Sequence, residues 1–280
     1  MTSYFEDTAQ FSQRKFNTEK PEDVQQRHRP CRHWEVSLFS ISFDRVAEIY
    51  DKTRSLPDEV MKKLIDAMAS ELESCKTILG VGVGTGRLAE PLRKAGYELA
   101  GIDISPRMIR KAKEKGIEQL LLADAQFLPF TPMTFDATIS VHVLHLIVEW
   151  KKVLQEICRV TRHSMFSVGD KRKDPVREAY GYLLEKYGYE RHRPGKSEQE
   201  LSELFCPAKS LFIASYDVSA DVSLSNLKRR TSSSQWRIPE DINLKIVQEL
   251  RREFAAKTFR QDLCLLKWDM DLLRTCCSTL

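Results

Sequence analysis

The hydrophobic positions of the chain change between two spacings along its first two thirds. Short apolar runs, partly β-branched, have the length of buried strands at 77–81, 97–102, 119–123, 135–141 and 165–168. Between them apolar residues recur at helical spacing, most cleanly at Trp150, Val153, Leu154 and Ile157. Strands that alternate with amphipathic helices predict an α/β protein with a doubly wound, mostly parallel sheet.

The flanking regions have weaker patterns. Helical spacing predicts helices over 43–55, 57–74 and 239–257, and residues 171–200 are charged, tyrosine-rich and helical in character. Ser105 followed by Pro106 predicts a helix start, and Ser197 with Glu200 predicts a capping box. Alternation predicts a strand over 211–224, and another apolar run predicts one over 263–268. Residues 226–236 are expected to form a basic, serine-rich loop.

A glycine-rich turn joins the first strand of the sheet to its helix. Gly82, Gly84 and Gly86 follow the run at 77–81, and the second run ends in Asp103. Glycines after a buried strand let a ligand approach bare backbone, and the helix that begins there offers free N–H groups. An acidic side chain at the tip of the next strand can accept both hydroxyls of a ribose. This combination predicts a site for a nucleoside-bearing ligand.

Two glycine frames fit this turn. Gly84, Gly86 and Ala89 satisfy a relaxed dinucleotide fingerprint, which keeps a nicotinamide-dependent oxidoreductase as an alternative. The tighter G-x-G-x-G spacing of Gly82, Gly84 and Gly86 resembles that of class I S-adenosylmethionine-dependent methyltransferases, in particular their small-molecule, quinone-biosynthesis-like branch. The resemblance extends over 78–147, through ILGVGVGTGRLAEPL, AGIDISPRMIRKAKEKG, LLADAQFLPF and FDATISVHVLHLI in the order that the family shows.

The resemblance implies a fold and an activity. The fold would be a Rossmann-like, seven-stranded, mostly parallel sheet with an antiparallel edge strand and a helical substrate cap between the fifth and sixth strands. We expect a flexible arm over 1–40, a cofactor-binding core over 41–170, and the cap with the final edge strands over 171–280. The activity would be in-line transfer of a methyl group from S-adenosyl-L-methionine to a small organic acceptor, with S-adenosyl-L-homocysteine as product.

The resemblance also implies cofactor-binding residues. Asp103 would accept the ribose hydroxyls, Asp124 the adenine amino group, and Tyr50 would lie beside the methionine end. The complete predicted set comprises Tyr50, Gly82, Val83, Gly84, Gly86, Asp103, Ile104, Met108, Asp124, Ala125, Gln126, Ser140 and Val141. For Tyr50, Ile104 and Met108 an ordinary core position is the alternative, and for Asp124 a turn-capping role.

Candidate catalytic residues follow the fourth strand. His142 and His145 lie where the family's substrate meets the methyl group, and a histidine suits a general base near neutral pH. A packed histidine is the alternative for either one. Arg229, Arg230, Ser232, Ser233 and Trp236 are expected to line the acceptor pocket or to form a solvated loop.

One position departs from the family pattern. Gly80 stands where the family usually has an acidic residue that orders the loop and the methionine end of the cofactor. A substitute carboxylate, weaker binding or a non-catalytic methyltransferase-like protein are the alternatives that this leaves open.

Composition narrows the remaining possibilities. A net charge of +4 over 280 residues is too small to indicate nucleic acid, although the basic stretch at 226–230 keeps a tRNA or protein methyltransferase as an alternative. The seven cysteines contain no C-x-x-C pair, so we expect no metal and reduced thiols in the cytoplasm. No apolar stretch is long enough to span a membrane, and no signal peptide is expected. The sequence predicts neither the acceptor nor the oligomeric state.

Overall fold

The computed structural model describes residues 16, 18, 41–172 and 174–277. The predicted N-terminal arm lies outside the described residues except for Phe16 and Thr18. Phe16 is buried, with its ring 5.0 Å from that of Phe135, and Thr18 forms an antiparallel bridge with Phe130. The division of the chain at 40 and 170 stays a prediction.

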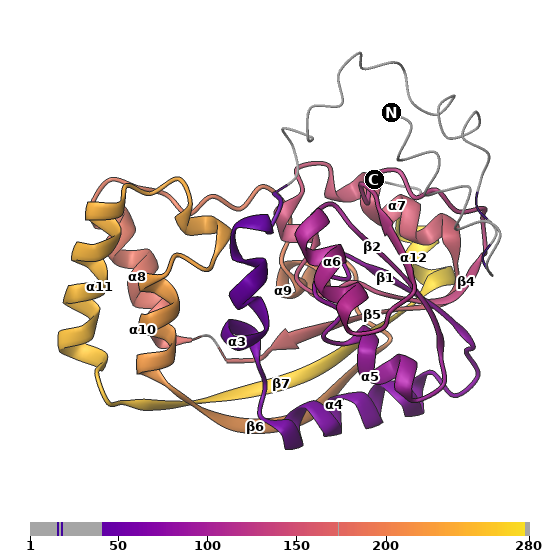
Figure 1. Ribbon diagram of the computed structural model, residues 1–280, viewed down its shortest axis with the longest axis horizontal. Coiled ribbons are helices and arrows are strands. Elements are labelled where there is room, and N and C mark those ends of the chain that lie inside the picture. Colours follow the sequence, from indigo (N-terminus) through magenta and orange to yellow (C-terminus); the bar gives the residue numbers. More distant parts are fainter. Residues whose placement is uncertain (1–15, 17, 19–40, 173, 278–280) are drawn as a thin grey trace, which may run out of the picture.

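The described residues contain one seven-stranded sheet, as the sequence predicts (Figure 1). Its strands are β1 (Thr77–Val81), β2 (Glu98–Asp103), β3 (Gln119–Leu122), β4 (Phe135–Ile139), β5 (Thr161–Asp170), β6 (Lys209–Ser219) and β7 (Thr258–Asp269). Their order is β3-β2-β1-β4-β5-β7-β6, and all pairs from β3 to β5 are parallel. Strand β7 is antiparallel to both β5 and β6. The antiparallel strand therefore lies one place inside the edge that β6 forms.

Helices cover both faces of this sheet. One face carries α4 (Asp58–Glu71), α5 (Ala89–Lys94) and α6 (Pro106–Glu114), whose apolar residues share a core with β1, β5 and β7. The other carries α7 (Trp150–Val160), α9 (Glu198–Leu204) and α12 (Met270–Cys277). The first described helices are η1 (Asp44–Ile49) and α3 (Tyr50–Arg54), and a short η2 (Leu144–Leu146) precedes α7.

Local signals that the sequence predicted are present at two helix starts. The Ser105 hydroxyl accepts a hydrogen bond from the Met108 N–H, with Pro106 at the first position of α6. The Ser197 and Glu200 side chains form the predicted capping box of α9. Each satisfies backbone donors that a helix N-terminus leaves without partners.

A separate helical cap extends beyond one end of the sheet (Figure 1). It consists of α8 (Pro175–Lys186), α10 (Ala220–Lys228) and α11 (Glu240–Phe254), with η3 (Ser233–Gln235) between the last two. These helices bury their own apolar cluster, which includes Val176, Leu224 and Ile246. At its centre the Tyr180 hydroxyl donates to Asn243 Oδ1 at 2.6 Å.

The cap differs from the prediction in its origin. It is built from two insertions, since α8 follows β5 whereas α10 and α11 lie between β6 and β7. The predicted strand over 211–224 is wrong beyond Ser219, because the Ser219 side chain caps α10 and the chain turns helical at Ala220. The predicted loop over 226–236 likewise begins as the last turn of α10.

Candidate functional site

A cavity of about 510 Å³ lies where the sheet, α3 and the cap meet. The strand order reverses between β1 and β4, and ligands of doubly wound folds bind at the carboxyl ends of the strands beside such a reversal. The cavity wall includes residues that follow β1, β2 and β4, and it continues to α8 and to the turn before α11. Its volume suits a small-molecule site.

Most of the predicted site residues line this cavity. They are Tyr50, Gly82, Gly84, Asp103, Ile104, Met108, Asp124, Ala125, Val141, His142 and His145. Val83 lines a smaller hollow of about 60 Å³ that also borders Gly80 and Tyr50. Gly86, Gln126 and Ser140 line neither one among the described residues.

The glycine turn leaves room at one position and is crowded at the other two. A side chain on Gly84 would meet nothing within 4 Å, whereas a Cβ on Gly82 or Gly86 would come within 2.3 Å of Val143 or Ile117. All three have positive φ, which glycine adopts without strain. Gly84 therefore exposes bare backbone to the cavity, while Gly86 allows the turn to pack against the end of α6.

Asp103 is fixed at the end of β2 by two backbone donors. Its carboxylate accepts from the N–H of Gly84 at 2.8 Å and from that of Ser105 at 2.9 Å. Burial, opposed by these hydrogen bonds, raises the pKa of Asp103 to about 6. A carboxylate has about four lone-pair sites, so it retains acceptors for ligand hydroxyls.

Asp124 lies on the turn after β3, beside the end of β2, since the Ala123 N–H donates to the Asp103 carbonyl at 3.0 Å. It accepts from the Gln126 N–H at 2.9 Å and from the Gln126 side-chain amide at 3.2 Å. The turn-capping role and a position in the cavity wall are both present for this residue. Gln126 is buried behind it and orients the carboxylate rather than lining the cavity.

A carboxylate outside β1 contacts the glycine turn. Asp51 of α3 accepts from the Thr85 hydroxyl at 2.5 Å and forms a 2.6 Å ion pair with Lys115. A side chain at position 80 would be crowded, since a Cβ added to Gly80 would lie 3.2 Å from the Val83 side chain. Asp51 thus contributes an ordering contact at a turn whose own strand lacks the acid.

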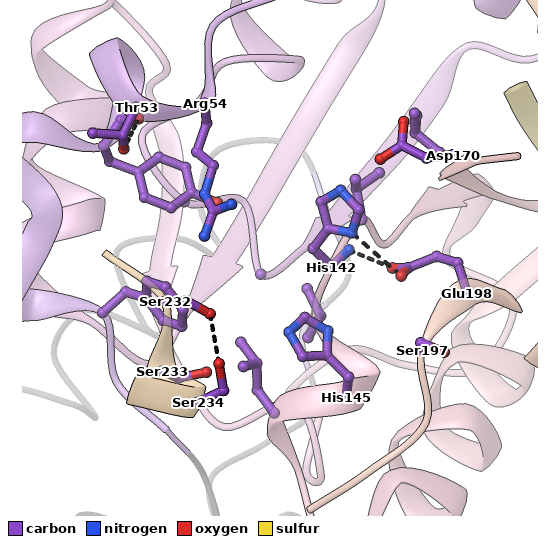
Figure 2. A pocket seen from close by; sticks show the side chains of 18 of the residues that line it. Thr53, Arg54, His142, His145, Asp170, Ser197, Glu198, Ser232, Ser233 and Ser234 are labelled. Atoms are coloured by element: carbon purple, nitrogen blue, oxygen red, sulfur yellow. Dashed lines mark hydrogen bonds and ion pairs between the residues drawn. The ribbon is translucent and has the colours of Figure 1, made fainter. Parts of the chain in front are cut away.

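The two candidate histidines point into the cavity from the segment after β4 (Figure 2). His142 has a φ of 58°, unusual for a residue with a side chain. Glu198, the first residue of α9, accepts from the His142 N–H at 2.6 Å and lies 3.2 Å from its Nδ1. This contact could not be predicted from the sequence, because Glu198 is 56 residues away along the chain.

Glu198 and His145 lie in different electrostatic environments, and the pKa of each is shifted for a different reason. Burial raises the pKa of Glu198, but the charge and hydrogen bond of His142 outweigh it and bring that pKa down to about 2. His145, with its ring centroid 6.4 Å from that of His142, has a pKa lowered to about 4, chiefly by burial. At neutral pH His145 is therefore an uncharged imidazole that can accept a proton.

Sequence reasoning missed several charged residues of the wall. Arg54, Arg177 and Asp170 line the cavity, and Figure 2 shows Arg54 on the opposite side from the histidines with Asp170 near His142. Surrounding protein atoms raise the pKa of Asp170, although its side chain stays open to the cavity. Nothing in their local sequence distinguishes these residues from surface charges.

The serine-rich turn before α11 divides into two groups. Ser232 and Ser233 line the cavity, as does Ser234, whose hydroxyl lies 3.1 Å from that of Ser232 (Figure 2). Arg230 instead donates to backbone carbonyls, among them that of Ile238 at 2.7 Å. Trp236 packs its ring 5.0 Å from that of Phe43, which joins the cap to η1. Arg229, Arg230 and Trp236 do not line the cavity in the described part of the chain.

Two further properties concern the described residues only. They contain no helix long and apolar enough to cross a membrane. They also contain no group of three His, Cys, Asp or Glu side chains placed to hold a metal ion.

Strand order and glycine turn define a Rossmann-like α/β protein with a cavity that Asp103 and Asp124 line. Comparison with known proteins gives a match to one family: residues 79–165 match the sequence model of the methyltransferase domain. The resemblance inferred from the sequence motifs is thereby confirmed. The matched residues do not include the helices of the cap.

Individual relatives agree with this assignment. The chain is 34% identical over 122 residues to malonyl-[acyl-carrier protein] O-methyltransferase of Hamiltonella defensa, covering 43% of this chain and 46% of that protein. It is 30% identical over 126 residues to demethylmenaquinone methyltransferase of Paenarthrobacter aurescens, covering 43% and 49%. The chain thus spans about half the length of the curated relatives it matches.

A solved structure supports the fold. The YcgJ protein of Bacillus subtilis superposes with a TM-score of 0.50 at 20% identity, covering 73% of this chain and 97% of that one. Identity at this level bears on the fold alone.

Proposed function

We propose that this protein is an S-adenosyl-L-methionine-dependent methyltransferase that acts on a small organic acceptor held between the core and the cap. The observation that carries the proposal is that Asp103, Asp124 and the bare backbone of Gly84 line one cavity. An acid for a ribose, an acid for an adenine edge and a glycine turn between them suit an adenosyl ligand.

The residues present fit this cofactor. Asp103 would hold the ribose hydroxyls, Asp124 and the Ala125 N–H the adenine, and Tyr50 would lie towards the methionine end. Asp51 supports the turn through Thr85, which offsets the missing acid at Gly80. When bound, the cofactor supplies an electrophilic methyl group on a sulfonium.

The chain's own part in the reaction is to position the acceptor and take its proton. The cofactor held by Asp103 and Asp124 would supply the methyl group with a neutral thioether as leaving group, and the acceptor atom would receive it. Holding the acceptor in line with the methyl group would lower the entropic part of the barrier. Neutral His145 or the Glu198-oriented His142 accepts the proton that an O–H or N–H acceptor loses.

The shape of the site favours a small acceptor over a macromolecule. The cavity is walled by α3, α8 and the serine turn as well as by the sheet, so a polymer would meet the cap before it met the histidines. Among the relatives, demethylmenaquinone methyltransferase is named for a small organic acceptor, whereas malonyl-[acyl-carrier protein] O-methyltransferase is named for an organic group carried on a protein. We expect reaction in the cytoplasm, with no nucleic-acid partner.

Titration calorimetry tests the proposal directly. The full chain should bind S-adenosyl-L-homocysteine and S-adenosyl-L-methionine with one site each and should not bind NAD. Binding of NAD alone would favour an oxidoreductase, and binding of neither would favour a non-catalytic relative. A screen with methyl-labelled cofactor and a metabolite extract, read by mass spectrometry of the products, then identifies the acceptor.

A further inference from the structure

Four arginines from three separate segments converge on the cap side of the cavity. Arg54 ends α3, Arg177 lies on α8, and Arg191 and Arg193 lie on the segment between α8 and α9. Figure 2 shows the Arg54 guanidinium directed into the cavity, across from His142 and His145. Clustered guanidinium groups repel one another unless nearby carboxylates or an anionic ligand neutralise their charge.

The matching carboxylates are few. Within the described residues, Arg54, Arg191 and Arg193 have no carboxylate within ion-pair distance, and Arg177 has only Asp174, at 3.5 Å. Burial lowers the pKa of Arg54. Burial and the charge of Arg54 lower that of Arg177 to about 10. The positively charged guanidinium groups of Arg54 and Arg177 therefore repel each other in a part of the cavity wall from which protein atoms exclude some of the water.

The acids of the same wall are largely engaged elsewhere. Asp174 accepts from the Val176 N–H at the start of α8 and from the Ser223 hydroxyl at 2.6 Å. Glu198 is held by His142. Asp170 remains, and it forms no ion pair with an arginine of the described residues at a distance of 4 Å or less.

The fold also makes room for one of these guanidinium groups. A Cβ on Gly181 would lie 2.2 Å from Nη2 of Arg191, so the guanidinium packs directly against the backbone of α8 at a position without a side chain. Arginine at this position is therefore packed into the wall rather than extended into solvent. Planar guanidinium groups bind carboxylate and phosphate oxygens in pairs.

We infer that the methyl acceptor carries an anionic oxygen group, a carboxylate or a phosphate monoester, which Arg54, Arg177 and Arg191 bind at the cap end of the cavity. The inference rests on the proposed function, since it assigns the substrate class of the same site. The anionic group would lie against the cap while the reacting atom faces the histidines. Ser232 and Ser234 offer hydroxyl donors on the same side (Figure 2).

Three probes of similar size that differ in charge test the inference. The full chain, saturated with S-adenosyl-L-homocysteine, is titrated with phenyl phosphate, benzoate and benzylamine in a calorimeter. We expect phenyl phosphate or benzoate to bind at least tenfold more tightly than benzylamine, and the stronger of the two anions identifies the group. Arg54→Gln and Arg191→Gln should each weaken that anion at least tenfold, whereas Arg110→Gln, on the exposed outer side of α6, should leave it unchanged.

Specific results would overturn the inference. Benzylamine binding as tightly as the anions would mean that Asp170 and Glu198, and not the arginines, determine which charge the cavity binds. Unchanged anion affinity in both arginine variants would mean that the arginines do not bind the anion. Should a glutamine variant fail to fold, Arg54→Lys keeps the charge without the fork and should bind the anion with intermediate affinity. Titration of the wild-type chain with S-adenosyl-L-homocysteine keeps the two proposals apart: cofactor binding without anion binding rejects the substrate class alone, and the reverse rejects the methyltransferase proposal. Retained binding of S-adenosyl-L-homocysteine by each arginine variant shows that the variant is folded.

Discussion

The backbone N–H of Gly84 donates a hydrogen bond to the Asp103 carboxylate at 2.8 Å. This contact ties the glycine turn after β1 to the tip of β2, and the second oxygen of Asp103 is held by the N–H of Ser105. The carboxylate is therefore oriented before any ligand arrives. Preorganisation of this kind lowers the ordering cost of binding.

Replacing Asp103 should weaken cofactor binding. Asp103→Ala removes a charged acceptor, so we expect the affinity for S-adenosyl-L-homocysteine to fall by about 1–3 kcal/mol. Calorimetry measures the change, and a thermal melt separates it from loss of folding. Asp66→Ala, which removes an exposed carboxylate on α4, is the matched control and should bind normally. An unchanged dissociation constant in Asp103→Ala would reject the ribose assignment.

Cofactor affinity should depend on pH through the same residue. The pKa of Asp103 is raised to about 6 in the free protein, and ribose hydroxyls donate better to the ionised form. Binding therefore releases a proton near this pH, and affinity should rise as the pH increases from 5 to 7. Asp103→Asn should flatten this dependence over that interval. A wild-type affinity that is constant from pH 5 to 7 would contradict the prediction.

His145 should remain neutral in mildly acidic solution. Burial lowers its pKa to about 4, and Arg54 is among the charges that lower it further. The imidazole proton signals in an NMR titration should therefore shift only near pH 4. Arg54→Gln should raise the midpoint, because it removes a positive charge, while Arg110→Gln should not. A midpoint near 6.5 in the wild type would show that the ring is solvated.

Crowding should make one glycine more sensitive to substitution than another of equal φ. Gly86 has a φ of 78° and its Cβ would collide with Ile117, whereas Gly188 has a φ of 80° and open space. Gly188→Ala should cost about 1 kcal/mol from backbone strain, and Gly86→Ala roughly 1–3 kcal/mol more. Chemical denaturation measures both. Equal losses would mean that Ile117 moves aside at no cost.

The core of the fold could be predicted because its signals are local. The glycine spacing, the acid that ends β2 and the Ser105–Pro106 helix start each depend on neighbouring residues. The strand prediction was wrong in the α10 region for the opposite reason. The apolar residues Val218, Ala220, Val222 and Leu224 alternate as in a strand, but packing against α8 and α11 favours a helix.

The polar wall of the site could not be predicted from spacing. Glu198 reaches His142 across 56 residues, and Arg54 meets Arg177 only because α3 lies between the core and the cap (Figure 1). No local sequence pattern predicts these contacts, since each of the charged residues resembles a solvated surface charge within its own segment. The glycine turn and the two acids of the cavity were within reach of the sequence, whereas the chemistry of the acceptor side was not.

The origin of the cap in two insertions has a mechanical consequence. Because α8 follows β5 whereas α10 and α11 bridge β6 and β7, the cap is fastened to the sheet at three strand ends. A single proteolytic nick in either connection would leave the helices attached through the other. The same anchoring opposes a wide swing of the lobe, so exchange of small molecules must proceed by local movement of the short segments around the mouth.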